Sequence, residues 1–218
     1  VLVAMGSLLR PLKQLTQVNQ QWQRGMAAAT SLFAILAQKN ELNEGRELLR
    51  KGQHSLSVSM LSFAYGDGKK NALNQISLTI PAGETLALVG ESGSGKTTLA
   101  NLILRFYNSP KNSLYINNIA IENYDIASLR SQISLVSQHI VLIDDTLANN
   151  IRFGCQREVT NNEVIQAAKN ADVWSFANQL PNGINSHIGE NGKNLSGGQR
   201  QRIAIARAML RDTSIIIL

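Results

Sequence analysis

The first 37 residues carry a pattern of apolar and polar positions that is typical of one long helix. After a mostly apolar start at residues 1–9, apolar side chains recur every three or four positions among glutamines, asparagines and basic residues. The recurring positions are Leu8, Leu12, Leu15, Val18, Trp22 and Met26. This spacing predicts one apolar stripe on a polar helix, which Pro11 should kink or deprive of a hydrogen bond.

Two interpretations of this helix remain open. One is an amphipathic helix packed on a neighbouring domain; the other is the cytoplasmic end of a transmembrane helix that runs into a soluble domain. Residues 1–9 alone are too few to span a bilayer, which needs about 20 residues. Basic residues follow this apolar start, at Arg10, Lys13 and Arg24, as they do on the cytoplasmic flank of membrane helices. They favour the second interpretation.

The rest of the chain alternates between strand and helix patterns. Residues 38–54 are polar and charged and are typical of a linker. The pattern then predicts strands from Leu56, through Val58, Met60, Phe63 and Tyr65, and at 73–80, 85–89, 113–116, 133–136 and 214–218. It predicts helices at 96–106, within 146–180 and at 199–211.

This order of elements predicts an α/β fold with a parallel core sheet. The first strands are joined by short turns, which indicates an added antiparallel sheet, and residues 146–180 indicate a helical subdomain. We therefore expect a helix at 1–37, a linker at 38–54 and one α/β domain at 55–218. The chain starts within one element and ends on an unterminated strand, so we interpret it as a fragment at both ends.

Composition narrows the function only slightly. The net charge is +6, but aromatic residues make up 5% and do not alternate with basic ones, which argues against nucleic-acid binding. Cys155 is the only cysteine, so a disulfide within the chain and a cysteine-rich metal site are both excluded. The three histidines, at 54, 139 and 187, fit no metal-ligand spacing, and the start lacks a signal-peptide cleavage pattern.

The stretch at 90–97, GESGSGKT, carries the clearest chemistry. It fits the G-x-x-x-x-G-K-[ST] loop, whose backbone N–H groups surround a nucleotide phosphate, and it has the required strand pattern before it and helix pattern after it. Lys96 would neutralise the β- and γ-phosphates, and the Thr97 hydroxyl would bind Mg²⁺. The motif predicts that 55–218 is a nucleotide-binding domain with a core sheet of the P-loop NTPase type. A tight turn between strand and helix is the alternative. The expected ATP-binding residues here are Gly90, Glu91, Ser92, Gly93, Ser94, Gly95, Lys96, Thr97 and Thr98.

A second glycine motif, LSGGQ, follows at 195–199. By itself it could be a flexible turn before a helix. Combined with the upstream loop, it resembles the signature motif of the nucleotide-binding domain of ABC transporters. The resemblance implies that Leu195, Ser196, Gly197, Gly198 and Gln199 act on the ATP bound by a partner subunit.

The same resemblance assigns roles to three further residues. Gln138 would touch Mg²⁺ or the attacking water and, with Lys96, would be catalytic; a surface glutamine is the alternative. Tyr65 would stack on adenine, although it could also be a core tyrosine at a strand end. Glu190 would contact the partner's membrane domain, unless it is an ordinary turn residue. The pair Asp144 and Asp145 is expected to cap the helix that starts near Thr146.

Stretches at 10–36, 146–151 and 176–212 resemble bacterial exporters of this family. The resemblance implies a homodimer in the inner membrane, with this domain on the cytoplasmic side, that uses ATP and Mg²⁺ to move lipid A or a similar amphipathic lipid. A multidrug or other lipid exporter, a non-transport ABC ATPase and a regulatory nucleotide-binding module are the alternatives. The family's metal-binding Asp and catalytic Glu would follow Leu218, so we expect the fragment alone to bind ATP weakly without hydrolysing it.

Overall fold

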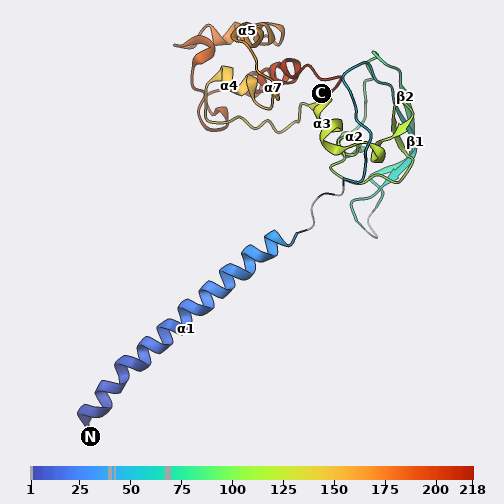
Figure 1. Cartoon of the computed structure of the whole chain (residues 1–218). Helices are drawn as coiled ribbons and strands as arrows, with labels where there is room; N and C mark the ends of the chain where they lie inside the picture. Colours follow the sequence, from blue (N-terminus) through green and yellow to red (C-terminus); the bar gives the residue numbers. More distant parts are fainter. Residues whose placement is uncertain (1, 39–40, 42, 67–69) are drawn as a thin grey trace. The chain divides into compact units, whose positions relative to one another are not determined.

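The computed structural model describes residues 2–38, 41, 43–66 and 70–218, with side chains described from residue 17 onward. Contacts divide the chain into two units, one ending at Leu42 and one running from Asn43 to Leu218. The first unit contains the predicted long helix, α1 (Leu2–Leu36), which continues as one helix through Pro11 (Figure 1). The proline therefore deprives the helix of a hydrogen-bond donor without ending it.

The apolar stripe of α1 is exposed where it is described. Val18, Trp22 and Met26 are each more than half exposed, whereas the side chains of Leu8, Leu12 and Leu15 lie outside the described residues. Within the described part of the chain, no helix combines the length and apolar character needed to cross a membrane.

The second unit contains an antiparallel sheet of four strands in the order β2-β1-β3-β4. Its strands are β1 (Leu56–Phe63), β2 (Leu73–Ile80), β3 (Leu114–Ile116) and β4 (Ile119–Ala120). Asn117 and Asn118 join β3 to β4, and both have positive φ (50° and 63°), as a two-residue hairpin turn requires. This sheet confirms the predicted antiparallel addition.

The alternation predicted for β1 is wrong at Met60. The pairing of β1 with β2 shifts between Val58 and Leu61, and Met60 has a φ of 46°. This irregularity turns Met60 outward and leaves Leu61 fully buried. An extra residue in one strand reverses the phase of every side chain after it.

A first hydrophobic core lies between this sheet and the elements next to it. Those elements are α2 (Lys96–Ile103), the short helix η1 (Ile121–Asn123), α3 (Ile126–Ser131) and a parallel pair of strands, β5 (Ile133–Leu135) and β6 (Ile215–Ile217). In the parallel pair, Ile133 lies opposite Ile215 and Leu135 opposite Ile217. The fold is therefore α/β, with the expected parallel and antiparallel sheets.

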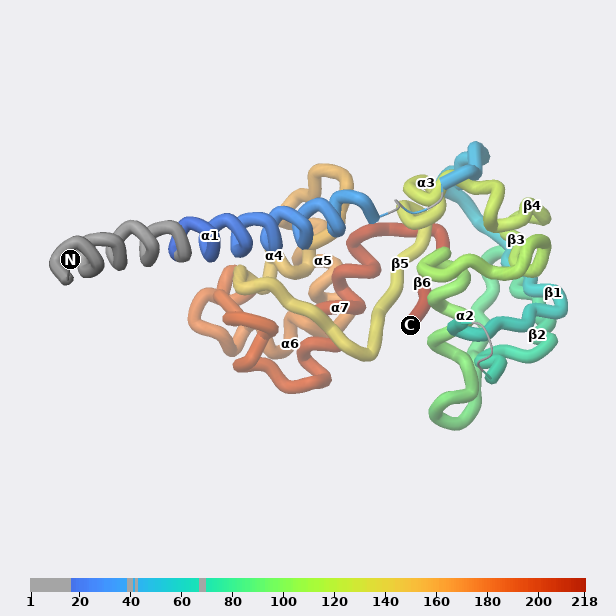
Figure 2. The backbone as a smooth tube through the Cα atoms, turned by 90° about the horizontal axis from the view of Figure 1, so that it is seen from below, coloured from blue at the N-terminus to red at the C-terminus, as the bar shows by residue number. Residues whose placement is uncertain are grey.

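The helices α4 (Leu147–Arg152), α5 (Asn161–Asn170), α6 (Trp174–Ala177) and α7 (Gly197–Arg211) form a second core (Figures 1 and 2). The short helices η2 (Gly183–Asn185) and η3 (Glu190–Gly192) lie between α6 and α7. Thr146 caps α4, since its side chain accepts the N–H of Asn149 at 3.1 Å. The cap predicted at Asp144 and Asp145 is thus one residue too early, although Asp145 accepts the Thr146 N–H.

The strand predicted at 85–89 is wrong. These residues have no regular structure, and Leu86, Leu88 and Val89 are 44%, 46% and 95% exposed. A strand needs a neighbour that accepts and donates its backbone hydrogen bonds, and the described strands pair only with one another. The apolar run therefore reaches the glycine loop as a segment without regular secondary structure.

Candidate functional site: two glycine motifs at helix starts

The first glycine motif forms the turn that starts α2. Gly95 is the residue before the helix and has a φ of 92°, and no side chain caps this end. A Cβ at Gly95 would lie 2.6 Å from the Ala72 carbonyl oxygen, so only glycine fits. The first N–H groups of α2 are therefore not capped by a side chain, and N–H groups at a helix start, together with the helix dipole, favour an anion.

Lys96 places its charge inside this loop. Its Nζ donates to the carbonyl oxygens of Gly90 and Glu91, both at 2.8 Å, and to Ser94 Oγ at 3.1 Å. Residues 90–94 are exposed. The loop therefore brings an ammonium group and an uncapped helix start together in an exposed segment, and such an arrangement binds a phosphate.

Tyr65 lies against the same helix. Its hydroxyl donates to Thr98 Oγ1 at 2.9 Å, and Thr98 is buried in the first turn of α2. Tyr65 as a whole is 42% exposed. The structure thus brings Tyr65 against the first turn of α2, directly after the glycine loop, and leaves it partly exposed. Thr97, between Lys96 and Thr98, is also exposed.

Gln138 comes from another part of the domain. It is exposed and follows β5, whose last residues run parallel to β6. Ligand sites in α/β proteins gather at the carboxyl ends of parallel strands, so its place in the fold suits a ligand contact. Among the described residues, however, no hydrogen bond joins Gln138 to the glycine loop.

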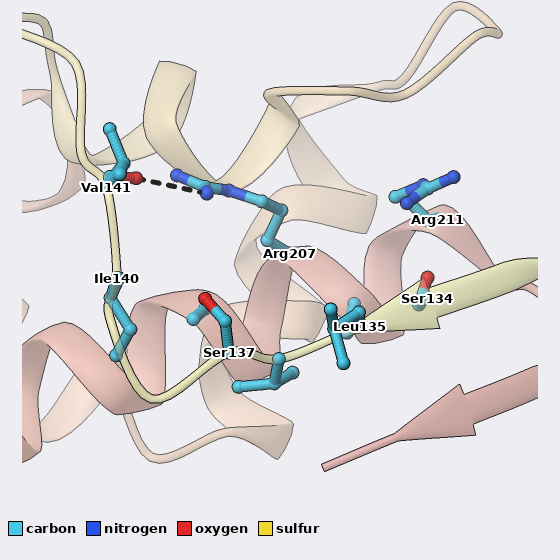
Figure 3. Close-up of a pocket in the computed structure, with 10 residues that line it drawn as sticks. Ser134, Leu135, Ser137, Ile140, Val141, Arg207 and Arg211 are labelled. Carbon is cyan, nitrogen blue, oxygen red and sulfur yellow. Dashed lines mark hydrogen bonds between the residues drawn. The ribbon is translucent and has the colours of Figure 1, made fainter. Parts of the chain in front are cut away.

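Two residues that the sequence analysis missed hold the segment after Gln138. Arg207 of α7 donates to the Val141 carbonyl oxygen at 3.3 Å, beside a small cavity of about 70 Å³ (Figure 3). Asn150 is fully buried and binds both the N–H and the carbonyl oxygen of Ile143 at 3.0 Å. Arg207 could have been noticed, because it occupies an apolar position of α7 between Ile203 and Leu210.

The second glycine motif starts α7. Ser196 and Gln199 form a capping box: Ser196 Oγ accepts the Gln199 N–H at 3.2 Å, and Gln199 Oε1 accepts the Ser196 N–H at 2.8 Å. Leu195 is buried in the helical core. The side chains of Leu195, Ser196 and Gln199 therefore stabilise the fold. Glu190, at the start of η3, is exposed.

Gly197 and Gly198, by contrast, are not required as glycines by the backbone or by close packing. Both are exposed, neither has a positive φ, and a Cβ at either position would meet nothing within 4 Å. Glycine lowers helix stability relative to alanine, so the fold of this chain gives no reason for two glycines here. Within the described residues, no hydrogen bond or ion pair joins this motif to the glycine loop at 90–97.

A match to a protein-family model includes both glycine motifs. The family model described as ABC transporter matches residues 73–218, which include the glycine loop, Gln138 and the LSGGQ motif. The chain belongs to the ABC transporter family. Its fold is also similar to a solved structure entitled "Structure of a bacterial Atm1-family ABC exporter with ATP bound", with a TM-score of 0.82, 32% identity, and coverage of 96% of this chain and 37% of that one.

Curated relatives match this ABC transporter chain over its whole length. It is 60% identical to "ATP-dependent lipid A-core flippase 2" of Colwellia psychrerythraea and 48% identical to "ATP-dependent lipid A-core flippase" of Salmonella typhimurium. All 218 residues align in both cases, and they cover 37% and 38% of those proteins. The chain thus spans little more than a third of the length of these relatives.

Proposed function

We propose that this chain is the ATP-binding part of an ABC exporter that couples ATP hydrolysis to movement of lipid A or a similar amphipathic lipid across the bacterial inner membrane. The open helix start at the glycine loop, with the Lys96 charge inside it, carries the ATP-binding part of the proposal. The 60% identity to a lipid A-core flippase supports the lipid.

In this proposal the glycine loop binds the ATP phosphates and Lys96 neutralises them. Tyr65 stacks on the adenine. The hydroxyl of Thr97 and the amide oxygen of Gln138 bind Mg²⁺, and Gln138 also orients the attacking water. These neutral oxygens fit the ion, because Mg²⁺ in nucleotide sites takes few protein ligands and relies on phosphate oxygens and water. When bound, Mg²⁺ would neutralise charge on the phosphates.

The exporter would act as a homodimer in which the 195–199 motif of one subunit meets the ATP held by its partner. The open space at Gly197 and Gly198 supports this, because a phosphate could approach their backbone closely. In the same proposal, residues 1–37 are the cytoplasmic end of a transmembrane helix, 38–54 a linker and 55–218 the nucleotide-binding domain on the cytoplasmic side.

Reconstitution of the full-length protein into liposomes tests the lipid assignment. Its Mg²⁺-dependent ATPase activity is measured with lipid A, with a phospholipid of equal charge and with a panel of amphipathic drugs. The Lys96→Ala variant gives the background. We expect lipid A to stimulate activity more than the other compounds. Stimulation by the drugs but not by lipid A would contradict the assignment and favour a multidrug exporter.

A further inference from the structure

Three aromatic rings meet beside the glycine loop. The centroid of the Tyr65 ring lies 5.2 Å from that of Phe63 and 5.0 Å from that of Tyr107, with interplanar angles of 83° and 85°. The Phe63 and Tyr107 rings are 6.0 Å apart. These distances and angles are those of favourable edge-to-face aromatic contacts.

The three rings come from different parts of the fold. Phe63 ends β1, Tyr65 follows two residues later, and Tyr107 follows the end of α2. The backbone before Tyr107 is fixed by a hydrogen bond from the Phe106 N–H to the Asn101 carbonyl oxygen at 2.9 Å. Tyr107 is thus attached to the far end of the same helix whose first turn bonds the Tyr65 hydroxyl.

Two ring contacts and one hydrogen bond at the hydroxyl therefore hold the Tyr65 side chain. Phe63 and Tyr107 contact its ring, and Thr98 accepts its hydroxyl hydrogen. Even so, Tyr65 as a whole residue is 42% exposed, and Tyr107 is 44% exposed. A ring that is fixed before the ligand arrives loses less rotational freedom when a base stacks on it.

We propose that Tyr107 is a positioning residue for the base of the bound nucleotide, and that it acts by holding the Tyr65 ring. The inference rests on the proposed function, in which Tyr65 stacks on adenine. The Tyr107 ring packs nearly perpendicular to the Tyr65 ring, and this contact restricts rotation of the Tyr65 ring. Phe63 supports the same ring from β1, but its neighbours in the sheet also depend on it.

The test measures binding of two ligands to the full-length protein by calorimetry in the presence of Mg²⁺. ATP carries a base, whereas inorganic tripolyphosphate carries only the phosphates. We expect Tyr107→Ala to raise the Kd for ATP by roughly two- to tenfold, the value of one aromatic pair, and to leave tripolyphosphate binding unchanged. Tyr107→Phe should bind ATP as tightly as the unmodified protein does, since the ring and not the hydroxyl makes the contact.

Two further variants make the test specific. Tyr115→Ala removes a tyrosine of β3 whose hydroxyl bonds Asn112 outside the cluster, and ATP binding should be unchanged. The double variant Tyr65→Ala with Tyr107→Ala should bind ATP no more weakly than Tyr65→Ala alone, because Tyr107 acts through Tyr65.

The outcomes separate this inference from the proposed function. If Tyr65→Ala weakens ATP binding and Tyr107→Ala does not, the inference is overturned and the proposed function stands. Equal weakening of ATP and tripolyphosphate by Tyr107→Ala would also overturn it, since that pattern indicates damage to the loop. If the unmodified protein binds neither ligand, both proposals fail.

Discussion

Arg207 and Val141 are 66 residues apart in the chain, yet the Arg207 guanidinium donates to the Val141 carbonyl oxygen at 3.3 Å. The same side chain donates through Nε to the Asn150 carbonyl oxygen at 3.0 Å and lies 5.2 Å from the centre of the Phe153 ring. One arginine thus ties α7, which begins at the second glycine motif, to the segment that follows Gln138.

Loss of this arginine should destabilise the helical part of the domain. Arg207→Met removes the donor of two carbonyl oxygens. Asn150 is buried, so loss of the donor to its carbonyl oxygen should cost about 1–3 kcal/mol, whereas Val141 is exposed and water can replace the donor there. Arg207→Lys should recover only part of this, because an ammonium cannot reach both oxygens. Thermal unfolding of the full-length protein measures the effect. Arg157→Lys, at an exposed ion pair, is the control and should change little; equal effects at both positions would contradict the account.

Asn150 should be among the least replaceable polar residues of the domain. Its amide makes three hydrogen bonds, two to Ile143 and one to the Thr146 carbonyl oxygen. Asn150→Ala should lower the free energy of unfolding by about 2–4 kcal/mol, since buried backbone groups are left unpaired. Asn149→Ala removes an exposed amide from the next position and should cost far less. Similar losses of stability in both variants would show that the buried hydrogen bonds of Asn150 contribute no more than those of an exposed amide.

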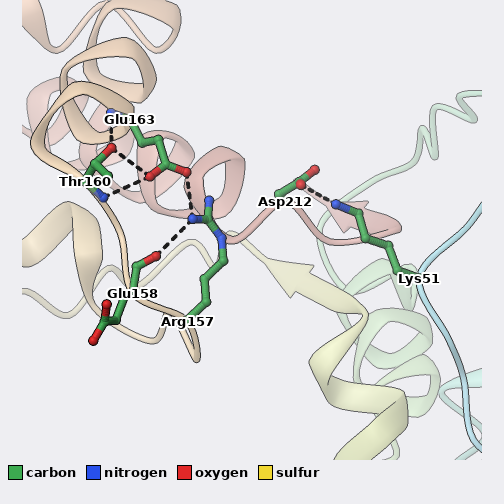
Figure 4. Close-up of polar contacts among 6 residues, drawn as sticks. All are labelled: Lys51, Arg157, Glu158, Thr160, Glu163 and Asp212. Carbon is green, nitrogen blue, oxygen red and sulfur yellow. Dashed lines mark hydrogen bonds and ion pairs between the residues drawn. The ribbon is translucent and has the colours of Figure 1, made fainter.

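Glu163 should make stability depend on pH. The Thr160 N–H and hydroxyl and the Arg157 guanidinium bond its carboxylate (Figure 4), and they lower its pKa from 4.5 to about 2. Because the folded pKa is the lower one, this contribution is present above pH 4.5 and is lost as the pH falls towards 2. Unfolding midpoints measured across that window should fall less steeply for Glu163→Gln. An unchanged slope would show that another group is responsible.

Gly198→Ala should separate stability from activity. The new methyl group meets nothing within 4 Å, and alanine is the better helix former, so the variant should be as stable as the original or more stable by up to about 1 kcal/mol. Its ATPase activity should nevertheless fall, because the methyl group would occupy the space that the partner's ATP needs. Unfolding and ATPase assays on the same preparation test this. Full activity with Gly198→Ala would contradict the assigned role.

Local chemistry explains which features the sequence could predict. The strand–helix order, the Lys96 loop and the start of α7 all follow from residues close together in the chain, such as the capping pair Ser196 and Gln199. The strand expected at 85–89 failed because strand formation depends on a partner, which no local pattern specifies. The alternation predicted for β1 failed at Met60 for a similar reason, because the register of β1 depends on its pairing with β2.

Contacts between residues far apart in the sequence could not be predicted. The partners of Arg207 and Asn150 are backbone carbonyl and N–H groups, which every residue has, so no motif reveals them. The contact between Tyr65 and Tyr107 joins residues 42 positions apart, and neither aromatic residue alone points to the other. The sequence could therefore supply the residues that we propose to meet a nucleotide, but not the residues that we propose to hold them in place.

Mixed dimers of the full-length protein test the central claim, that each glycine loop acts with the second glycine motif of its partner. One dimer carries Lys96→Ala in one subunit and Gly198→Glu in the other, and a second dimer carries both changes in a single subunit. The first retains one ATP site with both motifs intact if the motifs meet across the dimer, and the second retains none. We predict ATPase activity in the first dimer and background activity in the second; the reverse result would show that each chain completes its own site.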